Sequence, residues 1–139
     1  MFMPFDLKDL WTAGGVLLGF EVTAFSWRIK EESMLAREKN EITWLPPADF
    51  LNLLAMLAAS IGIFVLPVLG FSNLGLVKVL FGLSTILFVG HAFAIAGHYE
   101  LFNWRTKRSF KYFPMQEKIV IIVVSIVSLF YLFVALQRL

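Results

Sequence analysis

The stretch that decides the fold is residues 119–136, IVIIVVSIVSLFYLFVAL, which contains no charged side chain. An α-helix rises about 1.5 Å per residue, so a run of this length covers most of the roughly 30 Å of hydrocarbon in a bilayer. The whole chain of 139 residues is 59% hydrophobic and 16% charged, with a mean hydropathy of +0.78. This composition is far too apolar for an ordinary soluble domain and predicts an integral membrane protein.

Three further apolar runs complete the set of predicted spans, which cover residues 10–27, 50–69, 76–97 and 119–136. The first run is marginal in length for a crossing. Pro46, Pro47 and Pro114 precede the second and fourth runs, where a helix start tolerates the missing N–H. Pro67 is expected to bend or end the second helix. We therefore expect an all-α protein with a single domain, residues 1–139, built as a four-transmembrane-helix bundle with short loops.

Lysine and arginine divide the connections into two classes. The first loop, residues 28–49, and the third, residues 98–118, hold nearly all the basic residues: Arg28, Lys30, Arg37, Lys39, Arg105, Lys107, Arg108, Lys111 and Lys118. Because basic loops stay on the cytoplasmic side, these two loops are predicted to be cytoplasmic, with both termini on the non-cytoplasmic side. The charges of the first loop recur at helical spacing, which favours a solvated extension of the first helix. We expect the protein in the bacterial cytoplasmic (inner) membrane.

Small residues indicate which helix faces meet, because helices in lipid approach each other closely where side chains are small. The expected packing positions are Gly15, Gly19, Ala55, Ala59, Gly62, Gly90, Ala94 and Gly97. The fourth run has mainly β-branched and aromatic side chains. We expect it to be the most lipid-exposed helix.

Five ionisable or amide side chains fall within or beside the spans and form the predicted ion or proton pathway: Glu21, Asn52, His91, His98 and Asp49. Glu21 lies six residues before the end of the first run, as His91 does in the third, so both are expected at similar depth. A charge near the bilayer centre costs roughly 2.5 to 3.5 kcal/mol, so Glu21 is expected to face protein or water, and to be protonated if unpaired. A pair of Glu21 and His91 would titrate as one coupled unit.

A structural role for Glu21 stays open beside the functional one, since hydrogen bonds between membrane helices contribute about 0.6 to 2 kcal/mol. For His91 alone we favour the structural interpretation. His91 and His98 share a helix face but lie about 10 Å apart along the axis, too far to bind one ion together. We expect no metal and no cofactor.

The third loop interleaves aromatic and basic residues, of which the expected lipid or partner contacts are Trp104, Arg105, Lys107, Arg108, Lys111 and Tyr112. Such segments bind anionic headgroups, and each basic residue contributes about 1 kcal/mol near an anionic surface. The loop is too short to form an RNA-binding fold, so we expect no nucleic-acid partner.

No Walker loop, GxSxG, HExxH or CxxC motif is present, and the chain has no cysteine, so a non-catalytic role is favoured over an enzyme. The leading hypothesis is a small oligomeric membrane protein that forms or gates an ion or proton pathway, either as a membrane-permeabilising effector or as the membrane subunit of a larger complex. The alternative is a membrane anchor that docks a cytoplasmic partner through residues 28–49 and 98–118. The third is a haem- or quinone-linked redox protein that uses His91 and His98.

Overall fold

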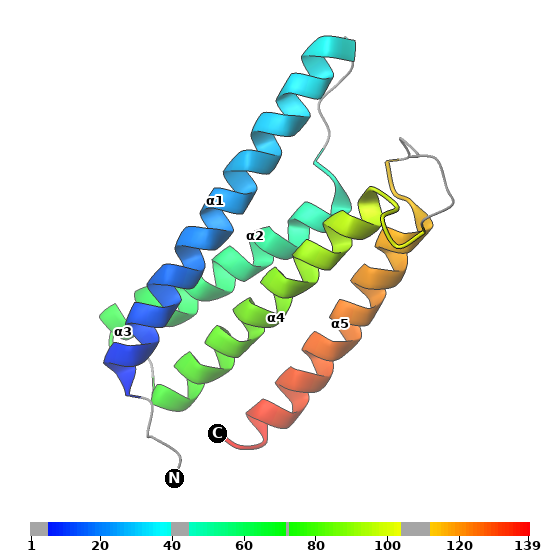
Figure 1. Ribbon diagram of the computed structural model, residues 1–139. Coiled ribbons are helices and arrows are strands. Elements are labelled where there is room, and N and C mark those ends of the chain that lie inside the picture. Colours follow the sequence, from blue (N-terminus) through cyan, green and yellow to red (C-terminus); the bar gives the residue numbers. More distant parts are fainter. Residues whose placement is uncertain (1–5, 40–44, 72, 104–111) are drawn as a thin grey trace.

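The computed structural model describes residues 6–39, 45–71, 73–103 and 112–139, which are helical and contain no strand (Figure 1). The helices, in chain order, are α1 (Leu7–Lys39), α2 (Pro47–Ala59), the π-helical segment η1 (Ser60–Val65), α3 (Leu66–Val68), α4 (Leu74–His98) and α5 (Met115–Leu136). Segments α2, η1 and α3 follow each other without a break. The all-α prediction is confirmed for the described residues.

Helix α1 is much longer than the predicted first span, because it continues through the charged residues that follow. Its 33 residues correspond to about 50 Å at the usual helical rise. The extension, RIKEESMLAREK, is rich in Arg, Lys, Glu, Met, Leu and Ala, which are good helix formers. At the other end the Asp6 carboxylate accepts a hydrogen bond from the Asp9 backbone N–H over 2.9 Å, a normal N-terminal cap. Figure 1 shows α1 reaching beyond the other helices at its C-terminal end.

The second apolar run changes its helical form before Pro67. Pro67 has no N–H, and its ring crowds the carbonyl four residues earlier, so the regular α-helical ladder is interrupted there. The interruption takes the form of η1, after which the Leu66 N–H donates to the carbonyl of Ile61, five residues back. The helix ends at Val68, and Gly70 follows with a φ of 76°, which favours glycine. The expectation that Pro67 bends or ends the helix agrees with this geometry.

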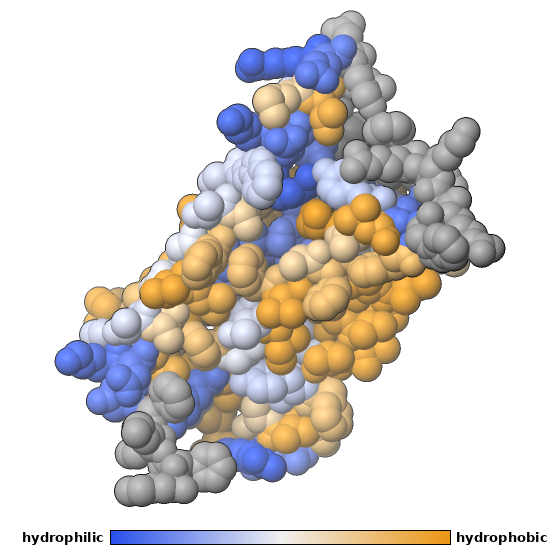
Figure 2. Space-filling model, viewed as in Figure 1, coloured by the Kyte–Doolittle hydropathy of each residue, from blue (hydrophilic) through white to orange (hydrophobic). Residues whose placement is uncertain are grey.

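Three helical segments are long and apolar enough to cross a membrane: Pro47–Val68, Leu74–His98 and Met115–Leu136. Helix α1 is not among them, because its apolar part contains Glu21 and several Gly and Thr residues, and its second half is charged. Three of the four predicted spans are therefore helices with the length and composition of a membrane span, whereas the first predicted span is not borne out in this way. Figure 2 shows hydrophilic residues gathered at the two ends of the molecule and a wide hydrophobic area between them.

Helix α4 is central in the packing. It contacts α1, α2 and α5, whereas α5 packs on α4 and leaves most of its surface exposed. Two apolar clusters form the core. The first joins α2, α4 and α5 through Ala48, Leu51, Ala55, Leu87, Ala94 and Val124. The second, called the Ile63 cluster below, joins α1, α2, η1 and α4 through Leu10, Ala59, Ile63 and Val77.

Most of the small residues predicted to mark helix contacts lie between helices. Ala55, Ala59, Gly62, Gly90, Ala94 and Gly97 are buried. A Cβ on Gly97 would lie 2.9 Å from the backbone of Gln116, so α4 and α5 approach here as only glycine allows.

The structure differs from expectation on α1, where Gly15 and Gly19 lie on the exposed face. Nothing lies within 4 Å of a Cβ built on Gly19. The glycine that faces the bundle is Gly14, whose added Cβ would lie 2.9 Å from the Ile63 side chain. The GxxxG spacing gave the wrong face because a shift of one residue rotates the facing direction by about 100° on a helix.

Candidate functional site

A column of buried polar side chains runs between α1, α2 and α4 towards the end of the bundle where α4 ends and α2 and α5 begin. We call this end the Arg28 end, and the opposite end, with the turn after α3, the Gly70 end. The column has two tiers. The inner tier consists of Glu21, Asn52 and Ser84, and the end tier of Arg28, Glu32, Asp49, His91 and Tyr99.

In the inner tier, three helices each contribute one side chain, and all three are completely buried. The Ser84 hydroxyl on α4 donates a hydrogen bond to Oε1 of Glu21 over 2.6 Å. The Asn52 amide on α2 donates from Nδ2 to the backbone carbonyl of Glu21 over 2.9 Å. Because a carbonyl can only accept, this bond also determines which end of the Asn52 amide faces α1.

Both hydrogen bonds leave acceptors unused. Glu21 Oε2 and Asn52 Oδ1 are buried without a hydrogen-bond partner among the described residues, and the same holds for Asp49 Oδ2 in the end tier. Buried polar atoms are nearly always hydrogen-bonded, and leaving one unsatisfied costs about 1 to 3 kcal/mol. These three oxygens therefore mark places where a proton, a water or a cation would be stabilised.

The end tier is organised by the Arg28 guanidinium. Its three nitrogens donate to Oε1 of Glu32 over 2.7 Å, to the Tyr99 hydroxyl over 2.7 Å and to Oδ1 of Asp49 over 3.4 Å. Burial alone lowers the pKa of Arg28, but the interactions with Asp49, Glu32 and the Tyr99 hydroxyl outweigh it and raise that pKa. The guanidinium is consequently a permanent charge.

His91 completes the end tier from α4. Its Nδ1 donates to the backbone carbonyl of Ala48 over 3.0 Å, and it lies 3.8 Å from Oδ1 of Asp49. Two carboxylates, Glu32 and Asp49, thus share the single guanidinium of Arg28. With both carboxyl groups ionised and His91 neutral, the tier carries one excess negative charge.

A third polar contact joins α5 to the column. Glu117, completely buried at the start of α5, accepts the backbone N–H of Ala48 at Oε1 over 2.7 Å. Its Oε2 lies 2.8 Å from Nδ1 of His98, which ends α4. One carboxylate thus caps the N-terminus of α2, where negative charge is favoured, and holds the C-terminus of α4.

The structure brings all five predicted pathway residues to this column or to its contact with α5, but Glu21 and His91 do not form a pair. Glu21 bonds to Ser84, which lies seven residues before His91 on α4, about 10 Å along the axis. Equal spacing from the ends of two apolar runs did not give equal depth, because α1 continues past its apolar run and its position is set by packing.

Sequence reasoning missed several residues of the site, namely Arg28, Glu32, Ser84, Tyr99 and Glu117. A signal for some of them is present in the sequence: Arg28 follows Glu21, and His91 follows Ser84, by seven residues, which places each pair on one helix face. Glu117 falls within the predicted third loop, residues 98–118. It lies in the first turn of α5, where an acidic residue is common.

The predicted loop contacts Trp104, Arg105, Lys107, Arg108 and Lys111 lie outside the described residues. Tyr112 is described and half exposed, and its hydroxyl donates to the backbone carbonyl of Leu45 over 3.4 Å. This bond joins the end of the third loop to the residues just before α2.

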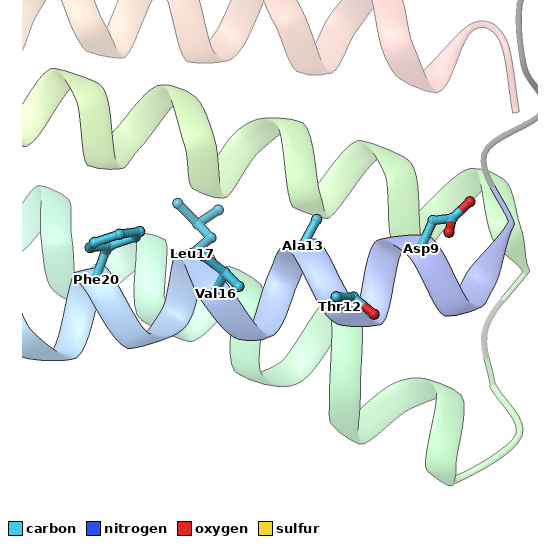
Figure 3. A pocket seen from close by; sticks show the side chains of 6 residues that line it. All are labelled: Asp9, Thr12, Ala13, Val16, Leu17 and Phe20. Carbon is cyan, nitrogen blue, oxygen red and sulfur yellow. The ribbon is translucent and has the colours of Figure 1, made fainter.

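No group of three or more His, Cys, Asp or Glu side chains in the described ranges is arranged to hold a metal ion. A separate groove of about 520 Å³ lies along α1, lined by Asp9, Thr12, Ala13, Val16, Leu17 and Phe20. Figure 3 shows Ala13 and Leu17 pointing towards the neighbouring helix. No residue of the polar column lines this groove.

Comparison with models of protein families, with curated proteins and with solved structures finds no match to this chain.

Proposed function

We propose that this chain is a small membrane protein that forms or gates a pathway for protons or small cations through the polar column. The observation that carries the proposal is that three buried oxygens of the column have no hydrogen-bond donor among the described residues: Glu21 Oε2, Asn52 Oδ1 and Asp49 Oδ2. Ionisable groups within membrane segments are costly and are found mainly where ions or protons are bound or moved. Acceptors in excess of donors favour a positively charged species.

Continuity of polar groups towards the Arg28 end supports a pathway rather than an isolated site. Asn52 and Asp49 are three residues apart on α2 and hence on one face. Asp49 lies beside both Arg28 and His91, and Arg28 reaches Glu32, which is partly exposed. A proton entering at Glu32 would pass the contact of Arg28 with Asp49 and then Asn52, one turn further along α2, on its way to Glu21.

The proposal includes a fourth span formed by α1, with both termini on the non-cytoplasmic side of a bacterial inner membrane. The support is twofold. Basic residues are concentrated in the first and third connections. Helix α1 also packs against α2 and α4, so its apolar half lies at the depth of two helices that are apolar enough to cross. The Arg28 end would then be cytoplasmic.

A homo-oligomer, or membership of a larger membrane complex, is part of the same proposal. Four helices enclose little volume, and most side chains of the polar column are buried within one chain. A wider aqueous pore would form more easily between chains than within one. Anionic lipid headgroups would contact the basic third loop on the cytoplasmic side.

The test is proton and cation flux into liposomes that contain the purified protein, compared for wild type and Glu21→Gln at matched incorporation. The pH range of about 5 to 8 is chosen because histidine titrates there. We expect flux that is lost in Glu21→Gln and kept in Glu38→Gln, a control at an exposed position on the same helix. Equal flux in wild type and Glu21→Gln would remove Glu21 from the pathway.

A second function, that of a non-catalytic anchor, is favoured by a different observation. Arg28 and Glu117 each tie two or three helices together through short contacts, as in a rigid scaffold. An anchor would dock its partner through the cytoplasmic loops. Reversing the charges of Arg105, Lys107 and Arg108 would then release the partner, while Glu21→Gln would leave partner binding intact.

A further inference from the structure

We propose that Glu21, with Ser84 and Asn52, is a binding site for a single proton that is open only towards the Arg28 end, and that Ile63 of the π-helical segment closes it towards the Gly70 end. This inference rests on the proposed function. It adds to that function the species that is bound and the end of the pathway that is closed. It can be tested without measuring transport by the wild-type protein.

The first step concerns the charge of Glu21. Its carboxyl group is completely buried, and no basic side chain in the described part of the chain forms an ion pair with it. The helices around Glu21 carry three titratable or charged groups on the same side: Arg28 on α1, Asp49 on α2 and His91 on α4. These three groups make their contacts in the end tier and not with the Glu21 carboxyl group. Within the described ranges, the side chains that hydrogen-bond to Glu21 are the Ser84 hydroxyl, at the carboxyl group, and the Asn52 amide, at the backbone carbonyl. A proton is the smallest species that removes the charge.

The second step concerns the number of ligands that the site offers. Ser84 already occupies Oε1 of Glu21, and the Asn52 amide nitrogen is used on the Glu21 carbonyl. The remaining free acceptors of the inner tier are Glu21 Oε2 and Asn52 Oδ1. A metal cation such as Ca²⁺ takes six to eight oxygens, and Mg²⁺ demands near-octahedral geometry, so two free oxygens suit a proton better.

The third step concerns access. On the Arg28 side of the inner tier, polar side chains continue to the surface through Asp49, Arg28 and Glu32. On the Gly70 side lies the Ile63 cluster, whose buried members are all aliphatic or alanine. An apolar constriction of this kind excludes water and blocks ions by dewetting.

The fourth step identifies the part of the constriction that can move. Ile63 is completely buried, and its side chain packs directly on Gly14. A Cβ added to Gly14 would lie only 2.9 Å from the Ile63 side chain. Ile63 also lies inside η1, the one π-helical segment in the described chain. Such segments are frequent at functional sites and hinges. A return from π to α geometry would rotate Ile63 away from Gly14 and open the column.

The first experiment is infrared titration of the purified protein in liposomes. The carbonyl stretch of a protonated carboxylic acid is expected in wild type near neutral pH and is expected to disappear in Glu21→Gln. It should persist in Glu117→Gln, the matched control at a second buried carboxyl. If the Glu21→Gln difference spectrum contains no protonated carboxyl band, the proton site is refuted.

The second experiment tests the closure with Ile63→Ala. We expect proton leak through liposomes to rise by roughly tenfold or more, which corresponds to ~1.4 kcal/mol taken off the barrier. The matched control is Leu87→Ala, a buried aliphatic residue of the other cluster. Adding Glu21→Gln to Ile63→Ala should abolish the extra leak. A leak no greater than that of Leu87→Ala would refute Ile63 as the closure.

The two proposals fail in different ways. If the protonated Glu21 band is present but neither the wild-type protein nor Ile63→Ala conducts, the pathway is overturned and the binding site remains. If flux is unchanged in Glu21→Gln and the protonated carboxyl band is missing, the proton site is overturned. The protein would then conduct by a route that does not include Glu21. Suppression of the band by Na⁺ at constant pH would overturn the choice of a proton as the sole ligand.

Discussion

The Glu117 carboxylate at the start of α5 caps the start of α2, where its Oε1 accepts the Ala48 backbone N–H over 2.7 Å. Pro46, the residue at the N-cap position of α2, makes no side-chain cap of its own. Glu117, 69 positions after Ala48, therefore provides the cap that a neighbouring Ser or Asp provides in most helices. This contact ties the last helix to the second, although α5 otherwise packs on α4.

We predict that Glu117→Ala lowers the free energy of unfolding in detergent by about 1 to 3 kcal/mol, because it leaves the Ala48 N–H buried without an acceptor. Glu117→Gln keeps an oxygen for that N–H and should cost less. Denaturant unfolding followed by circular dichroism measures both. Glu38→Ala, at an exposed site on α1, is the control. An Ala variant as stable as this control would show that the cap contributes nothing.

Replacing Arg28 by Leu should destabilise the fold by about 3 to 5 kcal/mol, since it leaves the Asp49 carboxylate buried without its cation. The double variant Arg28→Leu with Asp49→Leu should recover part of that loss, because no unpaired charge remains. The same unfolding assay gives the coupling between the two residues. Strictly additive effects would mean that the Arg28 to Asp49 contact of 3.4 Å carries no interaction energy.

Two glycines on different helices provide a matched pair of substitutions. Gly97→Ala should destabilise by about 1 to 3 kcal/mol, because the new Cβ would press against the backbone of Gln116 and Glu117, which cannot rotate away. Gly19→Ala meets nothing and should stabilise by up to about 1 kcal/mol through helix propensity. Thermal unfolding ranks the two variants. The opposite order would contradict the close approach of α4 and α5.

The absence of cysteine makes the proposed topology directly testable. Single substitutions Glu38→Cys and Arg138→Cys introduce thiols at exposed positions near the Arg28 end and the Gly70 end. In intact cells, an impermeant thiol reagent should label only the Arg138→Cys protein, and after lysis it should label both. Labelling of both in intact cells would contradict a crossing between the two sites.

The class of the protein follows from the sequence alone, and the reason is local. An apolar run such as residues 119–136 can satisfy its backbone in lipid only as a helix, whatever its neighbours are. Prolines before residues 48 and 115 set the helix starts for an equally local reason, which is the missing N–H. The distribution of Lys and Arg predicts orientation without any knowledge of packing.

Only the tertiary structure decided which side chains meet. The sequence places Glu21 inside the bundle but does not identify its partner on α4. That partner depends on the position of α1 along α4, and a shift of two helical turns separates Ser84, the observed partner, from His91. Depth estimated from the ends of apolar runs has an error of this size, since α1 continues far beyond its own run.

Rotation of the helices about their axes was equally inaccessible to sequence reasoning. Gly14 and not Gly15 faces the bundle, because the apolar bulk of Ile63 fills the space beside it. The π-helical turns that orient Ile63 arise where Pro67 interrupts the backbone hydrogen bonds and packing against α1 and α4 selects the geometry. Patterns along a chain determine which helices form, whereas the contacts in the polar column depend on translations and rotations that only the packed bundle defines.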